Sequence, residues 1–241
     1  MSEQGERRRI GFVVPMRVEM RPLVKTLSLR RSRLGDLRAY SGMLGAQNVL
    51  AVATGIGTQA ATDATEQLLR LTGVDHVVVV GVAGGVEPDI RIGDVVVPEV
   101  VVMASTGTEY RPAPLGEVTL RGRLLTTAVL ATGPEVLARL REQQVTAVDM
   151  ETASVAAVCQ RKGVPWTAFR AISDRLVDNI VDDSFTGLAN ADGTPRVGPM
   201  LRYVIKRPAR IRGMVKLSRD ISVATAAAAR TAIAACRAEI R

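Results

Sequence analysis

The stretch "HVVVVGVAGGV" (residues 76–86) decides the fold. Its apolar run is long enough for a strand and ends in a glycine loop at residues 81–85, and a run that is apolar on both faces is typical of a buried strand in an α/β protein. Comparable apolar segments are "RIGFVV" (9–14), "VTAVDM" (145–150) and "VPWTAFRAIS" (164–173). Helical patterns alternate with them, which indicates crossover helices. We therefore predict one α/β domain with a mixed, largely parallel twisted sheet flanked by helices.

The composition agrees with this class. The chain has 241 residues, of which 47% are hydrophobic and only 3% aromatic, so it can bury one large core of small and β-branched side chains. No apolar segment reaches the roughly 18 residues that a membrane-spanning helix needs, and no signal peptide precedes Pro15, so we expect a cytoplasmic protein. Cys159 and Cys236 lack the close spacing of a metal or redox pair, and we expect both to be buried free thiols.

The basic character is local. Acidic and basic residues balance over residues 1–160, so the whole net charge of +8 comes from residues 161–241. A basic stripe can bind phosphate backbones or anionic lipid. No nucleic-acid-binding motif or interleaved aromatic residue accompanies this one, so we expect no nucleic-acid partner.

A second stretch, "AVDMETASVA" (147–156), places two carboxylates where a strand runs into a helix. In parallel α/β sheets, ligands bind at the carboxyl ends of the strands. Glu19, the glycine loop at 81–85, residues 149–151 and residues 170–174 all fall at predicted carboxyl ends. The sequence therefore predicts that these four distant segments converge on one rim of the sheet.

Five segments in order carry a family resemblance: "IGFVVPMRVEM", "TGIGTQAA", "GVAGGVEPDIRIGDVVVP", "AVDMETASVAAVC" and "VPWTAFRAISD", spanning about residues 10–174. One glycine turn alone would be weak, because such turns are common. Together the segments resemble the purine nucleoside phosphorylase superfamily, and within it the 5′-methylthioadenosine/S-adenosylhomocysteine nucleosidases. The resemblance implies a barrel-like, nucleoside phosphorylase-like sheet, a homodimer or higher homo-oligomer, and cleavage of the N-glycosidic bond of an adenine nucleoside.

The resemblance also implies site roles. Glu19 matches the acid that deprotonates the attacking water, Asp174 the acid that donates to the base nitrogen with Ser173 beside it, and Arg170 an arginine near the nucleophile. Met150 matches the methionine under the sugar, and Glu151 the carboxylate that binds the ribose hydroxyls. This leaves Asp149 as a supporting or helix-capping acid.

The chemistry of glycosidic cleavage supports these roles independently of the family resemblance. Glycosidic cleavage passes through an oxocarbenium-like state and needs an acid at the leaving base and a base at the water. Taken singly, the residues also fit simpler interpretations: Glu19 an acid in the first turn of a helix, Asp174 a helix N-cap, and Arg170 a surface strand residue. The lone histidine, His76, precedes an apolar strand and is interpreted as structural.

Two departures from the family pattern bear on the substrate. The glycine loop that would line the site contains Val82, Ala83 and Gly84, with Val82 where the family commonly has a serine that holds water or phosphate. Leu130 stands nearest to the place of the family's base-stacking aromatic. The segment before the loop, "HVVVV", is apolar where phosphorolytic members supply an arginine, so the sequence favours water over phosphate as the acceptor.

The last segment leaves the substrate open. We place the catalytic domain at residues 1–197 and a basic helical extension, packed on the same domain, at 198–241. Residues 202–219 fit a solvated basic helix or, alternatively, a helix that contacts a membrane surface. This tail also resembles that of the hopanoid-associated nucleoside phosphorylases, which implies a lipid-linked nucleoside as an alternative substrate.

A third alternative is a non-catalytic purine-nucleoside binding protein, which the lost hydroxyl at Val82 and the lost aromatic would suit. The presence of Glu19, Glu151 and Asp174 together disfavours it, because a binding protein needs no acid directed at water. No metal-ligand cluster or nucleotide-cofactor motif is evident, so we expect neither a metal nor a cofactor.

Overall fold

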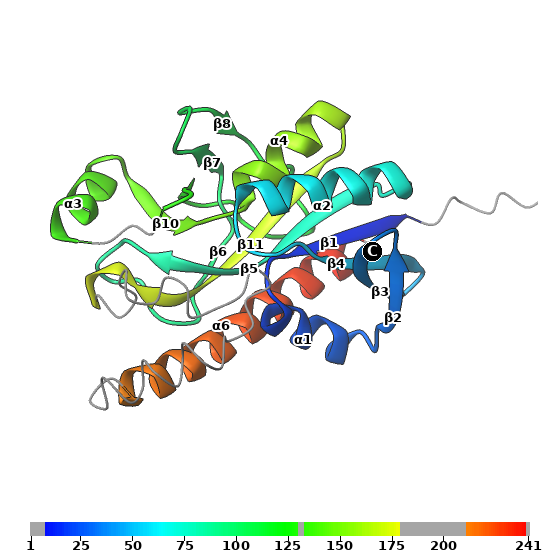
Figure 1. Cartoon of the computed structure of the whole chain (residues 1–241), viewed down its shortest axis with the longest axis horizontal. Coiled ribbons are helices and arrows are strands. Elements are labelled where there is room, and N and C mark those ends of the chain that lie inside the picture. Colours follow the sequence, from blue (N-terminus) through cyan, green and yellow to red (C-terminus); the bar gives the residue numbers. More distant parts are fainter. Residues whose placement is uncertain (1–7, 130–132, 179–210, 240–241) are drawn as a thin grey trace, which may run out of the picture.

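The computed structural model describes residues 8–129, 133–178 and 211–239 (Figure 1). The strands are β1 (Arg9–Val14), β2 (Arg30–Leu34), β3 (Leu37–Leu44), β4 (Gln47–Ala53), β5 (His76–Gly85), β6 (Val95–Val96), β7 (Val100–Met103), β8 (Glu109–Tyr110), β9 (Arg123–Thr126), β10 (Val145–Asp149) and β11 (Trp166–Arg175). The helices are α1 (Arg17–Thr26), α2 (Thr58–Leu71), α3 (Pro134–Glu142), α4 (Thr152–Lys162) and α6 (Ile211–Ala238), with a 3₁₀ turn at Leu176–Asp178.

The predicted fold class is confirmed: an 11-stranded mixed sheet is flanked by helices. The main strand order is β2-β3-β4-β1-β5-β10-β9-β7-β8, with β11 pairing with β5 and β6. Parallel pairs join β4, β1, β5 and β11 at the centre, and β7, β9 and β10 beyond it. Antiparallel pairs join β2, β3 and β4 at one edge and β7 and β8 at the other, and they also join β10 to β5 in the middle and β6 to β11. The sequence pattern did not reveal the short edge strands β2 and β8.

The valine run of β5 forms the axis of the sheet. Residues 77–80 are all at most 1% exposed, because β5 is paired along its length with β11 and is covered on both faces by helices. α1 and α6 pack on one face, with Met20, Leu23 and Ala228 in its core, and α2 and α4 cover the other (Figure 1). This double cover explains why the strand shows no alternation of polar and apolar residues.

The two strands that share the other edge of β5 run toward each other. β1 is parallel to β5 and pairs with residues 76–79, whereas β10 is antiparallel and pairs with Gly84 and Gly85. Their carboxyl ends therefore meet near Gly81 and Val82. The predicted convergence occurs, but the reason was partly wrong, because β10 reaches this point from the opposite direction rather than as another parallel strand.

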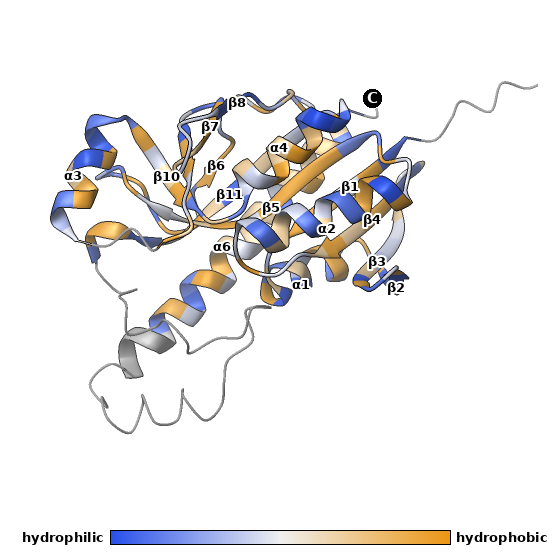
Figure 2. Ribbon diagram, turned by 45° about the horizontal axis from the view of Figure 1, so that its top comes forward, coloured by the Kyte–Doolittle hydropathy of each residue, from blue (hydrophilic) through white to orange (hydrophobic). Residues whose placement is uncertain are grey.

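Helix α6 is the longest helix described, with 28 residues. Its alanine-rich half, including Ala224, Ala228 and Ala232, is buried against the sheet, because small side chains let a helix approach closely. Apolar and hydrophilic residues alternate along the helix in Figure 2. Of the expected extension at 198–241, the part from Ile211 to Glu239 lies within the described residues and packs on the same sheet as the rest of the chain.

Cys159 and Cys236 are buried free thiols in opposite faces of the core, as predicted. His76 is also buried, with its Nε2 2.9 Å from the Thr167 hydroxyl. Because that hydroxyl donates to the Ala113 carbonyl, it accepts from the imidazole N–H, and burial lowers the pKa of His76 to about 4. Within the described ranges, no helix is both long and apolar enough to cross a membrane.

Candidate active site

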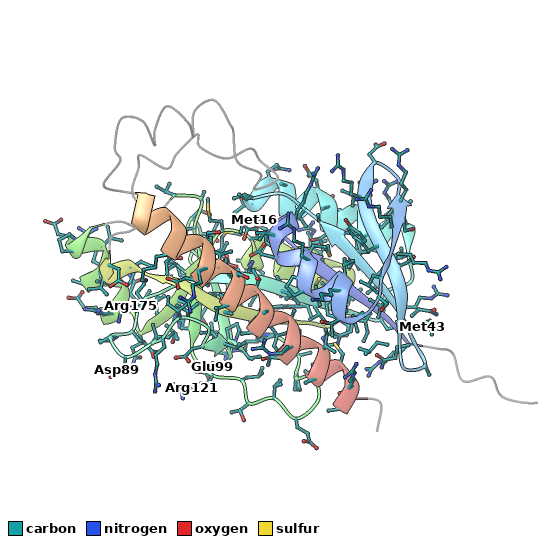
Figure 3. The ribbon with its side chains drawn as sticks, turned by 90° about the horizontal axis from the view of Figure 1, so that it is seen from below. Met16, Met43, Asp89, Glu99, Arg121 and Arg175 are labelled. Carbon is teal, nitrogen blue, oxygen red and sulfur yellow. The ribbon has the colours of Figure 1, made fainter. Side chains whose placement is uncertain are left out.

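A cavity of about 300 Å³ opens where β1, β5, β10 and β11 come together, within the size range of small-molecule sites. Met16, at the start of α1, and Arg175, at the end of β11, both line it and lie on either side of α6 in Figure 3. Its charged and polar lining consists of Glu19, Thr127, Asp149, Glu151, Ser173, Asp174 and Arg175. Apolar residues make up much of the remaining wall.

Glu19 fills the gap between the ends of β1 and β10. Its Oε1 accepts a hydrogen bond from the amide of Val82 at 2.8 Å, and its Oε2 accepts one from the amide of Met16 at 2.7 Å. The bond to Met16 satisfies an amide at the start of α1, so Glu19 also serves as a first-turn helix acid. Its side chain is almost fully buried, and this burial raises the pKa of Glu19 to about 7, against the opposing effect of Arg170.

Arg170 lies behind the cavity wall with 0% exposure, which contradicts the interpretation as a surface strand residue. Its Nη2 is 2.6 Å from Asp149 Oδ2 and 3.2 Å from Glu151 Oε2. The attraction of these carboxylates, together with that of Glu19, raises the pKa of its guanidinium despite the opposing effect of burial. Arg170 thus holds the carboxylates of Asp149 and Glu151 from outside the cavity lining.

Asp149 anchors this ion pair. Its Oδ1 accepts a hydrogen bond from Thr126 at 2.6 Å, and its Oδ2 accepts from both the amide and the hydroxyl of Thr152. The Thr152 hydroxyl in turn accepts from Arg170 Nε at 2.9 Å. The lone pairs of Asp149 are therefore used by protein donors, which fits its predicted supporting and capping role and fixes the position of Arg170.

Glu151 joins two distant parts of the chain. Its Oε1 accepts from the amide of Gly57 at 2.9 Å, and its Oε2 accepts from Arg170. Gly57 precedes α2 with φ of 101°, a backbone conformation that favours glycine and that directs its amide toward the carboxylate. Burial raises the pKa of Glu151, an effect that Arg170 opposes and Asp149 reinforces.

Gly81 lies next to the side chains of Arg170 and Glu19, and this position requires a glycine. A Cβ at Gly81 would lie 2.4 Å from Arg170 Nη1 and 2.7 Å from Glu19 Oε1. Any side chain there would push the guanidinium and the carboxylate apart. The glycine loop recognised in the sequence therefore includes one position where the charged groups approach the backbone directly.

Asp174 reaches the cavity through an irregularity in β11. The register of β11 against β5 shifts between Ile172 and Asp174, so Ser173 is the extra residue of a bulge. Bulges turn side chains away from the regular alternation of a strand. The Ser173 hydroxyl donates to Asp174 Oδ1 at 2.7 Å, and burial raises the pKa of Asp174 although this hydrogen bond opposes the shift.

The structure brings most of the sequence-predicted residues to the cavity. Met150, Val82, Ala83, Gly84 and Ser173 line it together with the four acids already described, Glu19, Asp149, Glu151 and Asp174. Arg170 contacts two of those carboxylates from outside the cavity lining. Leu130 lies outside the described residues, so its assigned place beside the base stays a prediction.

Sequence reasoning missed several residues. Leu217 and Ile221 of α6 line the cavity, which the spacing of apolar residues along the helix could have indicated from their separation of one turn. Ile56, Val129 and Leu176 add further apolar wall. Thr126 was hidden because a threonine that ends a strand carries no distinctive signal, although its position at a carboxyl end was predictable.

The cluster carries more acid than base. Three buried carboxyl groups, those of Glu19, Asp149 and Glu151, surround the single guanidinium of Arg170. Arg175, which also lines the cavity, is engaged by Asp178 at 2.8 Å. Over the ranges that the structure covers, no group of three or more His, Cys, Asp or Glu side chains is arranged to hold a metal ion.

Comparisons with known proteins agree with this arrangement. The family model of the phosphorylase superfamily matches residues 9–129 and 115–197. Among solved structures, the 5′-methylthioadenosine/S-adenosylhomocysteine nucleosidase of Neisseria meningitidis, in complex with methylthio-immucillin-A, is 18% identical with a TM-score of 0.71, covering 97% of this chain and 100% of that one.

Two further structures have the same fold. The 5′-methylthioadenosine nucleosidase of Arabidopsis thaliana is 21% identical with a TM-score of 0.70 and covers 95% of this chain and 94% of its own. The futalosine hydrolase of Helicobacter pylori is 19% identical with a TM-score of 0.69 and covers 94% and 97%. These structural similarities show a shared fold. The family model matches most of the chain, so the chain belongs to the phosphorylase superfamily.

Proposed function

We propose that this protein is a nucleosidase that hydrolyses the N-glycosidic bond of an adenine nucleoside of the methylthioadenosine/S-adenosylhomocysteine type. The observation that carries the proposal is the convergence of Glu19, Glu151 and Asp174 on one cavity from three separate strand ends. A glycosidic cleavage needs acid, base and cation stabilisation around one sugar, and this set offers all three.

In the proposed reaction, the Glu19 carboxylate accepts a proton from water as the water oxygen bonds to C1′ of the ribose. The C1′–N bond breaks, its electron pair goes to the purine, and Asp174 donates a proton to a ring nitrogen. Burial raises the pKa of Glu19 to about 7. It also raises the pKa of Asp174, which favours the protonated form that can donate to the purine.

Glu151 and Met150 hold the sugar in this proposal. The Glu151 carboxylate accepts hydrogen bonds from the ribose hydroxyls, and its negative charge stabilises the cationic sugar as the bond breaks. Met150 packs beneath the ring. Arg170 acts as a positioning residue, because it touches Glu151 and Asp149 and has no exposed surface with which to contact substrate.

Water is favoured over phosphate by the charges around the cavity. A phosphate dianion needs unengaged cationic or donor groups. Around the described lining, Arg170 is held by carboxylates, Arg175 is paired with Asp178, and Val82 offers no hydroxyl. Three acids near the nucleophile's position would repel a second anion. Phosphorolysis is therefore the runner-up.

One observation favours a second substrate class, a nucleoside with a long apolar substituent such as a lipid-linked one. Leu217 and Ile221 from α6 extend the apolar wall, and Val129, which also lines the cavity, is 71% exposed. These apolar side chains would contact an apolar 5′ substituent, including a long one that projects out of the cavity. A non-catalytic binding role is the third alternative.

We also propose a homo-oligomer. The apolar exposure of Val129 at the cavity and of Leu71 on α2 supports it, because a second copy would cover such side chains. Light scattering at micromolar concentration would give a mass of at least twice 25.7 kDa, and a mass of one chain would contradict this part of the proposal.

The test is a substrate panel. Release of the purine base, which is hypoxanthine from inosine and adenine from the others, is measured from methylthioadenosine, S-adenosylhomocysteine, adenosine and inosine, each with and without phosphate, for the protein and for its Glu19→Gln variant. We expect release from the thio-substituted nucleosides that is independent of phosphate and lost in the variant. Turnover that requires phosphate would establish the phosphorylase, and nucleoside binding that neither protein turns over would establish the lipid-linked substrate or the binding role.

A further inference from the structure

A dense basic surface lies outside the active site, on α1 and the hairpin of β2 and β3. Between residues 20 and 44 the basic residues are Arg21, Lys25, Arg30, Arg31, Arg33 and Arg38, all of them exposed. The only acid in this range is Asp36, in the hairpin turn. We call these six residues the α1–β2–β3 basic surface. The balance of charge over residues 1–160 conceals it, because acids elsewhere in the chain compensate.

The two elements of this surface adjoin. In Figure 3, α1 and the hairpin lie next to each other at the end of the molecule marked by Met43. The link between them is short, because β2 begins four residues after α1 ends. Arg31, Arg33 and Arg38 lie on the hairpin face that carries Tyr40, which packs on the α1 side of the core, whereas Arg30 lies on the other face of β2. Five of the six cations therefore share the α1 side of the sheet.

Among the residues that the structure describes, these side chains have no anionic partner. Arginines elsewhere are engaged: Arg8 contacts Glu239 at 2.7 Å and Arg161 contacts Glu66 at 2.6 Å. Within the part of the chain that the structure describes, the six residues of the basic surface form neither a hydrogen bond nor an ion pair through their side chains. Their charges are available to a partner.

The surface also contains like charges at neighbouring positions. Arg33 lies directly opposite Arg38 in the hairpin register, an arrangement that destabilises a pair of strands. Arg21 and Lys25 are spaced i, i+4 on α1, which destabilises a helix in the same way. Each like-charge pair lowers the stability of the unbound protein. A bound anionic surface would offset this repulsion.

Protection of a sheet edge does not account for this pattern. β2 is the outermost strand, and charged residues on an edge strand discourage pairing with other chains. That reason covers Arg30, Arg31 and Arg33. It does not cover Arg38, since β3 is paired on both sides, and it does not cover the residues on α1.

We propose that the α1–β2–β3 basic surface binds the headgroups of an anionic lipid bilayer. Six long, flexible, exposed cations spread over a helix and a hairpin suit a broad surface whose own charges are mobile. A specific small-anion site would instead hold its arginines through buried partners. Single-stranded nucleic acid is disfavoured, because the only aromatic residue of the segment is Tyr40, which is half-buried. None of the six residues lines the cavity.

The experiment is co-sedimentation of the full chain with vesicles of phosphatidylcholine alone or with about one third phosphatidylglycerol, at low and at high salt. Each Lys or Arg near such a surface contributes about fivefold to the partition constant. We expect binding only to the anionic vesicles, lost at high salt, and weakened at least tenfold in the triple variant R31Q/R33Q/R38Q. The matched control is R70Q/R121Q/R139Q, which removes the same charge at exposed positions elsewhere.

Circular dichroism and thermal unfolding would establish that both triple variants are folded. Equal weakening by the two triples would overturn the proposal, because net charge alone would then explain the binding. Full binding by R31Q/R33Q/R38Q would also overturn it and assign the contact to the C-terminal segment. Tighter binding to poly(U) or to polyglutamate than to the anionic vesicles would replace the lipid by another partner class.

Discussion

Arginine occurs in this protein in two opposite settings. Arg170 is fully buried, contacts two carboxylates and lies within the electrostatic reach of a third. Arg33 and Arg38 are exposed and face each other across a hairpin, with no carboxylate in contact among the described residues. In the first setting the protein supplies every partner of the cation, and in the second it supplies none.

The difference separates catalytic geometry from surface recognition. A buried cation surrounded by acids fixes the positions of those acids and opposes the rise in pKa that burial causes. An exposed cation without a partner has little effect on the folded structure and remains available to an anion. The two regions should therefore respond to substitution in opposite ways, which the following predictions test.

The largest effect is expected at Glu19. Glu19→Gln keeps the size of the side chain and one of the two hydrogen bonds from the Met16 and Val82 amides, because its amide has a single acceptor oxygen. It removes the base, and general base catalysis contributes about 10²- to 10⁴-fold. Single-turnover adenine release from methylthioadenosine should fall by that factor, while the dissociation constant changes little. An unchanged rate in a folded variant would remove Glu19 from the mechanism.

Asp149→Ala should cost stability. It leaves Arg170 with one fewer carboxylate and orphans the Thr126 and Thr152 donors, and breaking a buried ion pair typically costs about 3–5 kcal/mol. The control is Glu66→Ala, which breaks the exposed pair with Arg161 and should cost at most about 1 kcal/mol. Urea unfolding measures both, and similar losses would mean that Asp149 does not anchor Arg170.

Activity and stability should move in opposite directions with pH. The pKa of Glu19 is about 7 in the folded protein against an ordinary value of 4.5, so the protonated form is favoured by folding. Its contribution to stability is fully present below pH 4.5 and is lost as the pH rises to about 7, with a slope of at most about 1.4 kcal/mol per pH unit. The free energy of unfolding of Glu19→Gln, relative to the unchanged protein, should therefore increase across this range.

Over the same range kcat/KM should rise, with an apparent pKa about 7, because only the ionised Glu19 accepts a proton. A pH profile of kcat/KM and parallel unfolding experiments provide the comparison. An activity limb near pH 4.5 would show that burial does not perturb Glu19, and would weaken the account of the buried cluster.

The smallest effect is expected in the exposed region. Arg33→Gln removes a like-charge pair and should raise the free energy of unfolding by about 0.2–1 kcal/mol. Arg31→Gln is the control, since Arg31 lies opposite Tyr40 instead of another cation. If Arg33→Gln is no more stable than Arg31→Gln, the two arginines do not repel each other in the folded protein.

Much of the fold was predictable because its signals are local. The valine run of β5, the Pro134 start of α3 and the Gly163 end of α4 each follow from the preferences of neighbouring residues. The short edge strand β2 was not predictable, because "RRSRL" reads as a charged loop and becomes a strand only through its pairing with β3.

The acids of the candidate site were predictable from motifs, and their supports were not. Nothing in the order of residues shows that β10 meets β5 antiparallel, or that Thr126 reaches Asp149 from β9. Leu217 and Ile221 approach the cavity because a long helix crosses the sheet, which depends on how the whole chain packs. Such contacts depend on the tertiary structure. The carboxylates can be recognised from sequence motifs, because the proposed chemistry requires them.

The most direct test of the central claim is the hydrolysis of methylthioadenosine in ¹⁸O-labelled water with phosphate present, followed by mass spectrometry of the sugar. We predict free methylthioribose that carries one ¹⁸O atom, formed at a rate that phosphate does not change and that Glu19→Gln lowers by about 10²- to 10⁴-fold. A sugar 1-phosphate without the label would contradict it, because the buried acids would then be directing phosphate rather than water to the ribose.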